Sequence, residues 1–242
     1  PSLKPAVPHI HADISKATLN ITGLTANNKI YDGTTVASLS GNATISAIQG
    51  DVVAISGSAT STFNDKNAGT SKAVTTTGYS LTGNDSSNYN LVSPVLAANI
   101  TKANLTVTAA ADSKTYDGTT SASNNTAPTV GALAGAAAGD TLASAATQAY
   151  TDKNAGSNKT THANAVSIKD SANNNVTDNY NISYVDNTAS TISKANLTVT
   201  AVADSKTYDG TTSASNNTAP TVGALAGAAA GDTLASAATQ AY

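Results

Sequence analysis

Short runs that alternate branched apolar residues with polar residues recur along the chain. Residues 19–22, 105–108 and 197–200 (LNIT, LTVT and LTVT) follow this alternation, which is the period-2 pattern of a strand with one buried face. The segments 52–55 and 73–77, together with Val166-Ser-Ile, fit the same template. The pattern therefore predicts an all-β chain.

Turn-forming residues separate these runs. Gly50-Asp51 lies between apolar residues, which predicts a two-residue hairpin because glycine accepts positive φ at the first central position. The pairs Gly139-Asp140 and Gly231-Asp232 occupy the same place further along the chain. A second kind of turn is predicted at the Asp-Gly of each Tyr-Asp-Gly-Thr-Thr sequence.

The segment 130–140 (VGALAGAAAGD) is ambiguous between helix and strand. Its alanines favour a helix. It aligns, however, with the strand-like segment 43–51 (ATISAIQGD), and it contains three glycines. We expect a strand followed by a turn; a short helix there would favour a β-grasp module instead.

The chain repeats itself at a long period. Residues 102–150 return at 194–242 with one difference in 49 positions, Ala110 against Val202. A more diverged copy precedes them, with Tyr-Asp-Gly-Thr-Thr at residues 31–35. A period of 85–92 residues is one small domain per repeat. The predicted divisions are the last strand of a preceding repeat (1–15), repeat 1 (16–100), repeat 2 (101–192) and a truncated repeat 3 (193–242).

The spacing of strands and turns suggests the architecture of each repeat. About seven short strands per repeat, with turns every 8–12 residues, are typical of a small immunoglobulin-like β-sandwich. A β-grasp-like module is the alternative. The junction at residues 98–107 contains neither Gly nor Pro, so one strand is expected to continue across it. Tandem modules joined in this way would form a stiff, extended rod.

Composition narrows the possible functions. The 12 cations are all Lys, the 15 anions are all Asp, and there is no Cys. Clustered Lys and Arg are needed to bind phosphates, so nucleic acid is not expected as a partner. No apolar run approaches the ~20 residues of a membrane helix, so no membrane insertion is expected in this segment. Each core must be lean, because the chain has one Phe and much of its apolar content is Ala.

Several motifs in fixed order resemble the YDG repeats, related to the MBG domains, of large secreted bacterial surface proteins. The matching sequences are KIYDGTT (29–35), FNDKNAG (63–69), NYNL (88–91) and ITKANL (100–105). The resemblance covers nearly the whole chain. Such repeats occur in filamentous-haemagglutinin-like exoproteins, between a secretion domain and an anchoring end. The resemblance implies a location outside the cell or at the bacterial surface, and a role in adhesion or biofilm.

The residues singled out belong to the YDG and NYN motifs, and a structural role is expected for all of them. They are Tyr31, Asp32, Gly33, Tyr116, Asp117, Gly118, Tyr208, Asp209, Gly210, Tyr89 and Tyr180. The YDG tyrosines are expected to pack with their hydroxyls bonded to nearby backbone, with a sugar-stacking platform as the alternative. The adjacent aspartates are expected to accept backbone N–H bonds in turns.

A few residues also suggest other chemistry. The lysines two residues before each YDG tyrosine (Lys29, Lys114 and Lys206) are candidates for Lys–Asn isopeptide bonds, and Asp65-Lys-Asn-Ala-Gly is a candidate calcium loop. His9 and His11 alternate onto one strand face, but no third metal ligand accompanies them. No carboxylate pair has a fixed offset in every copy. The sequence therefore predicts no enzyme, cofactor or metal.

The pattern favours extracellular stalk repeats that project or bundle a bacterial adhesin or matrix fibre. The expected partners are neighbouring repeats and other copies of the chain. One alternative is that each module binds extracellular polysaccharide weakly, with avidity from repetition. Another is a fibre subunit completed by strand donation between chains.

Overall fold

The structure, a computed structural model, describes residues 13–123, 126–215 and 219–242, and it confirms the all-β expectation. These residues contain strands and short 3-10 turns but no α-helix. The strands of repeat 1 are β1 (Ala17–Asn20), β2 (Thr22–Ala26), β3 (Lys29–Ile30), β4 (Val36–Ala37), β5 (Leu39–Thr44), β6 (Ala54–Phe63), β7 (Gly69–Thr82), β8 (Tyr89–Val92) and β9 (Leu96–Thr101). Of the strand predicted at residues 1–15, residues 1–12 lie outside the described residues, and residues 13–15 belong to no strand.

The strands of the rest of the chain follow the same order in outline. They are β10 (Ala103–Thr108), β11 (Ser113–Thr115), β12 (Thr129–Val130), β13 (Thr141–Leu142), β14 (Gln148–Tyr150), β15 (Gly156–Ala163), β16 (Ile168–Lys169), β17 (Tyr180–Val185), β18 (Asn187–Ser193), β19 (Val199–Thr200) and β20 (Thr221–Val222). The 3-10 turns are η1 (Ser86–Asn88), η2 (Ala136–Ala138), η3 (Thr177–Asn179) and η4 (Ala228–Ala230).

The described chain divides into two compact units. The first contains residues 13–103 with the short segments 134–140 and 178–180. The second contains residues 104–133, 141–177 and 181–242. The two short segments of the first unit come from repeat 2, so this unit includes contacts between residues of successive repeats.

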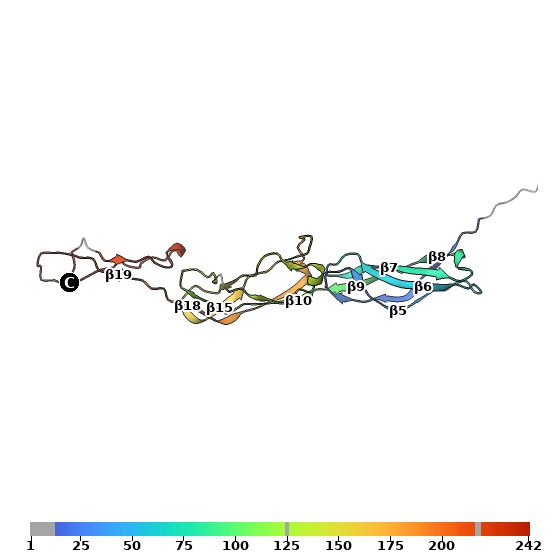
Figure 1. The fold of residues 1–242 in the computed structure, drawn as a ribbon, viewed down its shortest axis with the longest axis horizontal. Helices are drawn as coiled ribbons and strands as arrows, with labels where there is room; N and C mark the ends of the chain where they lie inside the picture. Colours follow the sequence, from blue (N-terminus) through green and yellow to red (C-terminus); the bar gives the residue numbers. More distant parts are fainter. Residues whose placement is uncertain (1–12, 124–125, 216–218) are drawn as a thin grey trace, which may run out of the picture. The chain divides into compact units, whose positions relative to one another are not determined.

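A five-stranded sheet forms the largest part of the first unit. Its strand order is β3-β9-β7-β6-β4, and the same unit holds the pairs β2-β5 and β1-β8. Figure 1 shows β6, β7 and β9 running alongside one another. The strands β3 and β4 lie at opposite edges of this sheet. The YDG loop between them, residues 31–35, therefore crosses one end of the sheet.

The second unit contains a four-stranded sheet, β11-β18-β15-β14. A three-stranded sheet, β12-β10-β17, and the pairs β13-β16 and β19-β20 complete it. Strands β1 and β8, β3 and β9, and β11 and β18 pair in parallel. Parallel neighbours need a long connection between them, so each of these pairs joins segments far apart in sequence.

The predicted Gly-Asp hairpins are wrong. Gly50 has a φ of 101° and Gly139 a φ of 95°, so both turns exist. The strands on either side belong to different sheets, however: β5 pairs with β2, whereas β6 pairs with β4 and β7. Gly50-Asp51 and Gly139-Asp140 each carry the chain from one sheet to another, and the geometry of the turn alone does not reveal this.

The predicted strands and junctions agree with the structure in part. The alternating run at residues 105–108 lies in β10, whose residues alternate between buried and exposed, and residues 73–77 lie in β7. The ambiguous segment 130–140 differs from the expected strand and turn, because only Val130 lies in a strand, β12, and Ala136–Ala138 form the single 3-10 turn η2. A single residue, Lys102, separates β9 from β10, as expected of a continuous junction strand. At the next junction five residues separate β18 from β19.

The cores are lean, as the composition predicts. In the second unit Val107, Ala109, Ala163 and Val166 form a buried cluster. Buried hydroxyl pairs supplement the apolar contacts. Ser61 and Thr76 are hydrogen-bonded at 3.1 Å in the first unit, and Thr161 and Ser190 at 3.2 Å in the second.

Truncating Val107 should cost stability. The side chain is fully buried, so Val107→Ala removes two methyl groups and leaves a cavity. We expect the free energy of unfolding to fall by about 2 kcal/mol. The matched control is Val199→Ala, the same position in repeat 3, which is 54% exposed and should change the free energy of unfolding by less than ~0.5 kcal/mol. Urea unfolding measures both. Equal losses would contradict the assignment of Val107 to the core.

Candidate functional site: a tyrosine–aspartate joint

Each YDG loop is organised around a lysine ammonium. Lys29 Nζ donates to Asp32 Oδ1 at 2.8 Å, to the Thr34 carbonyl at 2.8 Å and to the Val36 carbonyl at 2.9 Å. It also lies 5.5 Å from the centroid of the Phe63 ring, a cation–π distance. Asp32 Oδ1 in turn accepts the Thr34 N–H at 2.9 Å. The aspartate is therefore a turn residue, as predicted.

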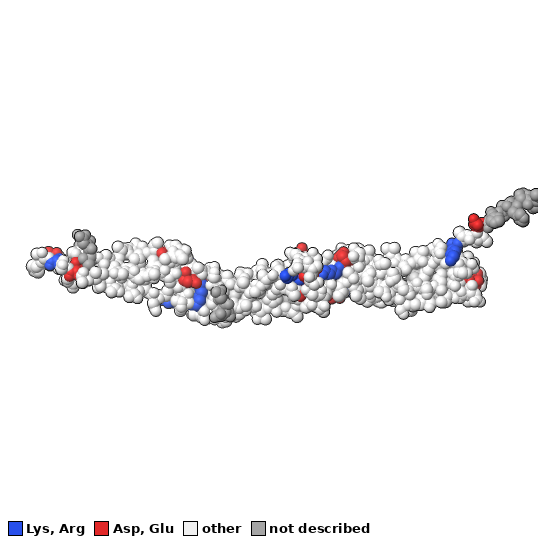
Figure 2. All heavy atoms as spheres, turned by 45° about the horizontal axis from the view of Figure 1, so that its top comes forward, with Lys and Arg blue, Asp and Glu red and all other residues white. Residues whose placement is uncertain are grey.

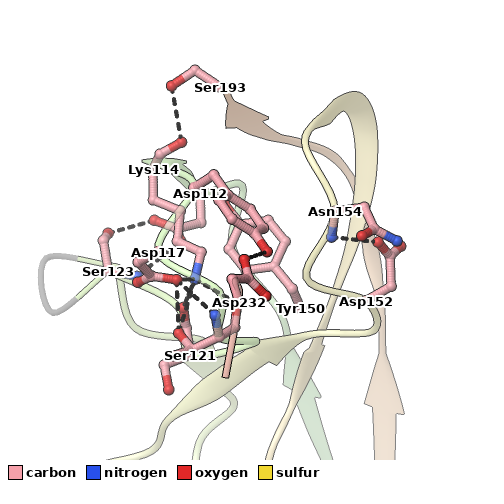
Figure 3. A network of polar contacts seen from close by, with 12 residues as sticks. Asp112, Lys114, Asp117, Ser121, Ser123, Tyr150, Asp152, Asn154, Ser193 and Asp232 are labelled. Atoms are coloured by element: carbon pink, nitrogen blue, oxygen red, sulfur yellow. Dashed lines mark hydrogen bonds and ion pairs between the residues drawn. The ribbon is translucent and has the colours of Figure 1, made fainter. Parts of the chain in front are cut away.

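The same arrangement recurs in the other two copies. Lys114 Nζ bonds Asp117 at 2.9 Å (Figure 3) and Lys206 Nζ bonds Asp209 at 2.8 Å. Hydrogen bonds from these lysines, with those from the threonines two residues on, lower the pKa of each aspartate to about 2. The Lys29, Lys114 and Lys206 ammonium groups donate to aspartate, threonine and backbone oxygens of their own YDG loops. The structure thus gives no support to the isopeptide candidate.

Tyr31 reaches into a turn of repeat 2. Its ring is 1% exposed, and its hydroxyl donates to Asp140 Oδ2 at 2.9 Å. Tyr180 of the NYN motif donates to the same oxygen at 2.8 Å, and the two rings meet edge to face at 5.4 Å. We call Tyr31, Asp140 and Tyr180 the first joint. The expected backbone partner for the Tyr31 hydroxyl is wrong: its partner is a carboxylate 109 residues away.

Glycine allows the close approach at the first joint. Gly33 has a φ of 77°, and a Cβ on it would lie 2.7 Å from Ala138 Cβ and 3.1 Å from Gly135 Cα. Gly135 is equally confined, because a Cβ there would lie 2.2 Å from Asp140 Oδ2. The YDG glycine therefore serves two purposes: it permits the turn, and it lets the loop contact the next repeat.

A second pair of contacts supports the first joint. The Ala68 N–H donates to Asn179 Oδ1 at 2.8 Å, and Asn179 Nδ2 donates to Asn67 Oδ1 at 3.1 Å. Asn179 is 4% exposed and immediately precedes Tyr180. The DKNAG loop is thus a contact surface toward the NYN motif of the next repeat, and not a cation loop.

The joint recurs between repeats 2 and 3 within the second unit. Tyr116 donates to Asp232 Oδ2 at 2.5 Å, which raises the pKa of the tyrosine. Lys153 pairs with Asp232 Oδ1 at 3.2 Å. A Cβ on Gly118 would lie 2.8 Å from both Ala230 Cβ and Gly227 Cα. We call Tyr116, Asp232 and Lys153 the second joint; Figure 3 shows Asp232 inside the polar network of repeat 2.

The remaining motif tyrosines occupy different environments. Tyr89 donates to Asp51 Oδ2 at 2.5 Å, as Tyr180 does to Asp140. Tyr208, the YDG tyrosine of repeat 3, is 93% exposed. The three YDG tyrosines thus differ in exposure to solvent. Tyr31 is buried in the first joint, Tyr116 is partly buried in the second joint, and Tyr208 is exposed.

The described residues contain no candidate metal centre. No group of three or more His, Cys, Asp or Glu side chains that could hold a metal is found there. Asp65 Oδ1 is occupied by the Asn67 N–H and by Lys72 Nζ. His162 pairs with Asp186, while His9 and His11 lie outside the described residues. Within the described part of the chain, no helix is long and apolar enough to span a membrane.

Comparison with known families identifies the repeats. Residues 15–97 and 101–189 both match the YDG domain. The chain belongs to the YDG domain family. No curated protein and no solved structure matches it. The boundaries of the two YDG domains place Tyr31 in one and Asp140 with Tyr180 in the other, so the first joint connects successive YDG domains.

Sequence reasoning found the donor side of the joint and missed the acceptor side. The motifs point to Tyr31 and Tyr180, whereas the sequence around Asp140 predicts only a turn. The available signal was internal: an aspartate follows the turn glycine in all three copies, as Asp51, Asp140 and Asp232. A hairpin turn does not need an aspartate at this position in every copy, whereas tyrosine hydroxyls that donate there need a carboxylate in every copy.

A buried carboxylate also stabilises the interior of the second YDG domain. Asp112 is 6% exposed. Burial alone would raise its pKa, but hydrogen bonds from Ser123 and Thr126 lower the pKa to about 2. Ser123 donates both its N–H, at 2.9 Å, and its hydroxyl, at 2.5 Å. Asn27 is the counterpart of Asp112 in the first domain, counting back from the YDG tyrosine.

The joint predicts a difference between two glycine substitutions. Gly33→Ala and Gly210→Ala carry the same backbone cost, because φ is 77° at Gly33 and 75° at Gly210. Only Gly33→Ala also pushes a methyl group into Ala138, since nothing lies within 4 Å of a Cβ at Gly210. Gly33→Ala should therefore lose about 1–3 kcal/mol more in urea unfolding. Equal losses would show that the close approach contributes nothing.

Asp112 predicts an acid-sensitive step in stability. Its pKa is lower in the folded chain than in the unfolded chain, so its contribution is complete above pH ~4 and is lost as the pH falls toward ~2. The contribution is roughly 2 kcal/mol. Asp112→Asn should flatten this part of the stability curve relative to the parent chain. Chemical unfolding at pH 2 to 6 measures it, and parallel curves for both proteins would contradict the assignment.

Proposed function

We propose that these YDG domains are extracellular structural repeats, which project or bundle a bacterial surface adhesin or matrix fibre. The observation that carries the proposal is the recurrence of one joint, with the same residue types, at two successive boundaries: Tyr31 with Asp140 and Tyr116 with Asp232. A contact repeated from domain to domain is what a linear array requires. Copying the domain then adds length without new chemistry.

The proposed mechanism is mechanical. A domain that donates its YDG tyrosine to the next domain resists bending at that boundary, because the hydroxyl, the glycine contact and the Ala68–Asn179 bond lie at separate points. We propose that the domains are small sandwiches arranged as an extended rod. The lack of an α-helix among the described residues supports a sandwich over a β-grasp module.

The surface composition fits a spacer outside the cell. In the view of Figure 2, blue and red side chains lie close together in small groups, separated by long uncharged stretches. Such a surface offers no extended basic patch, on that face, for a polyanion. The absence of Cys suits a chain that crosses an oxidising compartment.

The structure weakens the main argument for polysaccharide binding. A sugar-stacking platform requires an accessible aromatic face, and the Tyr31 ring is 1% exposed. The YDG motif of the first domain therefore serves the joint. Polysaccharide binding by the first domain would need a different surface.

Small-angle X-ray scattering of the chain tests the proposal. A compact globule of this length has a radius of gyration of about 18 Å, whereas an extended array should give about twice that value. Gly33→Ala should broaden the distribution of interatomic distances, because it disturbs the first joint, while Gly210→Ala should leave it unchanged. A parent chain near 18 Å would refute the rod.

A further inference from the structure

The first and last segments of the first YDG domain lie side by side and run in the same direction. β1 pairs in parallel with β8, with Ala17 opposite Tyr89, and β3 pairs in parallel with β9, with Lys29 opposite Ile100. The offset between partners changes only from 72 to 71 residues, so both pairs belong to one continuous alignment. The two aligned segments, which we call the terminal clamp of the first domain, are residues 17–31 and 89–101.

Single backbone hydrogen bonds extend the clamp beyond the paired strands. The Ile21 N–H donates to the Val92 carbonyl at 3.1 Å, directly after the β1–β8 pair. The Tyr31 N–H donates to the Thr101 carbonyl at 2.8 Å, directly after the β3–β9 pair. Between them, β2 pairs with β5 instead. The first segment of the domain is thus bonded to the last segment near both of its ends.

The second domain has the same arrangement. β11 pairs in parallel with β18 over three residues. The Tyr116 N–H donates to the Ser193 carbonyl at 2.8 Å directly after this pair, and the Ala109 N–H donates to the Val185 carbonyl at 2.8 Å before it. The terminal clamp of the second domain is therefore formed by residues 109–116 and 185–193.

Parallel pairing determines how a pull along the chain acts on each clamp. Tension enters the first domain at the start of β1 and leaves it at the end of β9. Because the clamp segments are parallel, these two points lie at its opposite ends, and the pull draws one segment lengthwise past the other. The hydrogen bonds near both ends of the clamp then carry the force together. If the segments were antiparallel, the two points would lie at the same end, and the bonds would break one after another.

Burial keeps water away from the clamps. Leu19 and Ile21 of the first segment are each 3% exposed, and Ile100 of the last segment is 2% exposed. In the second domain, Ala109 is 2% and Ile192 is 1% exposed. A buried backbone group that loses its partner is not solvated at once, so breaking a single bond here is costly. The bonds of a clamp are therefore expected to fail together rather than singly.

The clamps are also connected to each other and to the joints. Lys102 alone separates the end of β9 from the start of β10, so no slack linker lengthens before the domains take up the tension. The Tyr31 N–H lies in the first clamp and its hydroxyl in the first joint, and Tyr116 has the same two roles in the second clamp and joint. The first segment of each clamp thus ends at the residue that contacts the next domain.

We propose that each YDG domain resists stretching through its terminal clamp, so that the domains stay folded when the chain is pulled from its ends. This function deepens the structural role proposed above, and it rests on that role only for the source of the pull. A tethered surface protein is pulled along its chain whenever the cell or its partner moves. Domains whose first and last segments are sheared, and not peeled apart, keep their length under such tension.

Single-molecule force spectroscopy of the full chain tests the clamp. The chain has no Cys, so two introduced cysteines define where the pulling handles attach. Lys16→Cys with Lys102→Cys pulls the first clamp lengthwise, and both native side chains are exposed. Unfolding between these points should require a several-fold higher force than the control geometry, and it should lengthen the tether by about 250 Å.

Lys16→Cys with Ser87→Cys is the matched control. Ser87 is exposed and lies just before β8, so this pull acts on the starts of β1 and β8, which are at the same end of the clamp. It opens the pair one bond at a time, and the unfolding force should be low. Urea unfolding of both variants should give the same free energy, which assigns the difference in force to the direction of pulling. In the second domain, Lys102→Cys with Lys194→Cys should reach the high force as well.

Equal forces in the two geometries of the first domain would overturn the proposal, as would a low force in the second domain. The result is separable from the rod. An extended scattering profile with equal forces would refute the clamp alone, whereas a compact profile with direction-dependent forces would refute the rod alone.

Discussion

The hydrogen bond from a YDG tyrosine to an aspartate of the next domain is the constraint on which the rest depends. Asp140 is 2% exposed, and a buried carboxylate is costly unless hydrogen bonds compensate for the lost water. Two tyrosine hydroxyls converge on its Oδ2, while its Oδ1 has no hydrogen-bond partner. Because these two hydroxyls are the side-chain donors to Asp140, the loss of either tyrosine would leave the buried carboxylate with a single side-chain donor. We therefore expect the first joint to form with both hydrogen bonds in place, because a partly formed joint would leave a poorly compensated buried carboxylate that destabilises the folded chain.

The two joints meet the same requirement in different ways. At the first joint the second donor to the aspartate is Tyr180, from the same domain as Asp140. At the second joint it is Lys153, from the domain that also donates Tyr116. Tyr116 and Lys153 lower the pKa of Asp232, so the charged form is favoured there. The first joint is sealed and uncharged on the donor side, whereas the second contains an ion pair that is accessible to water and hence weaker.

Sequence reasoning recovered what is local. Alternation located β10, and the turn signals located Gly33, Gly118 and Gly210, whose φ values lie between 75° and 79°. The parallel pair of β3 and β9 could not be predicted in this way, because its residues are about 70 positions apart and no turn connects them directly. The same holds for the first joint, in which Tyr31 and Asp140 share no local pattern. Self-similarity revealed that the domains repeat, but it did not reveal which surfaces of successive copies meet.

The near-identical segments of the chain show that neighbours, rather than local sequence, decide burial. Residues 102–150 and 194–242 differ at one position in 49. Leu105 is nevertheless 2% exposed and Leu197 43%, and Tyr116 donates into a joint whereas Tyr208 faces solvent. The difference must come from the strands and turns that other parts of the chain supply.

This dependence has an energetic reason in the lean composition. Few aromatic side chains are available: Tyr31 and Tyr180 meet in the first joint, and Phe63 lies beside the Lys29 ammonium. An aromatic ring contributes most when it is fully covered, and for Tyr31 the cover includes residues of the next domain. A domain built in this way gains part of its stability from its neighbour. Its stability in an array is then a sum of intrinsic terms and nearest-neighbour terms, which favours long runs of identical copies over isolated domains.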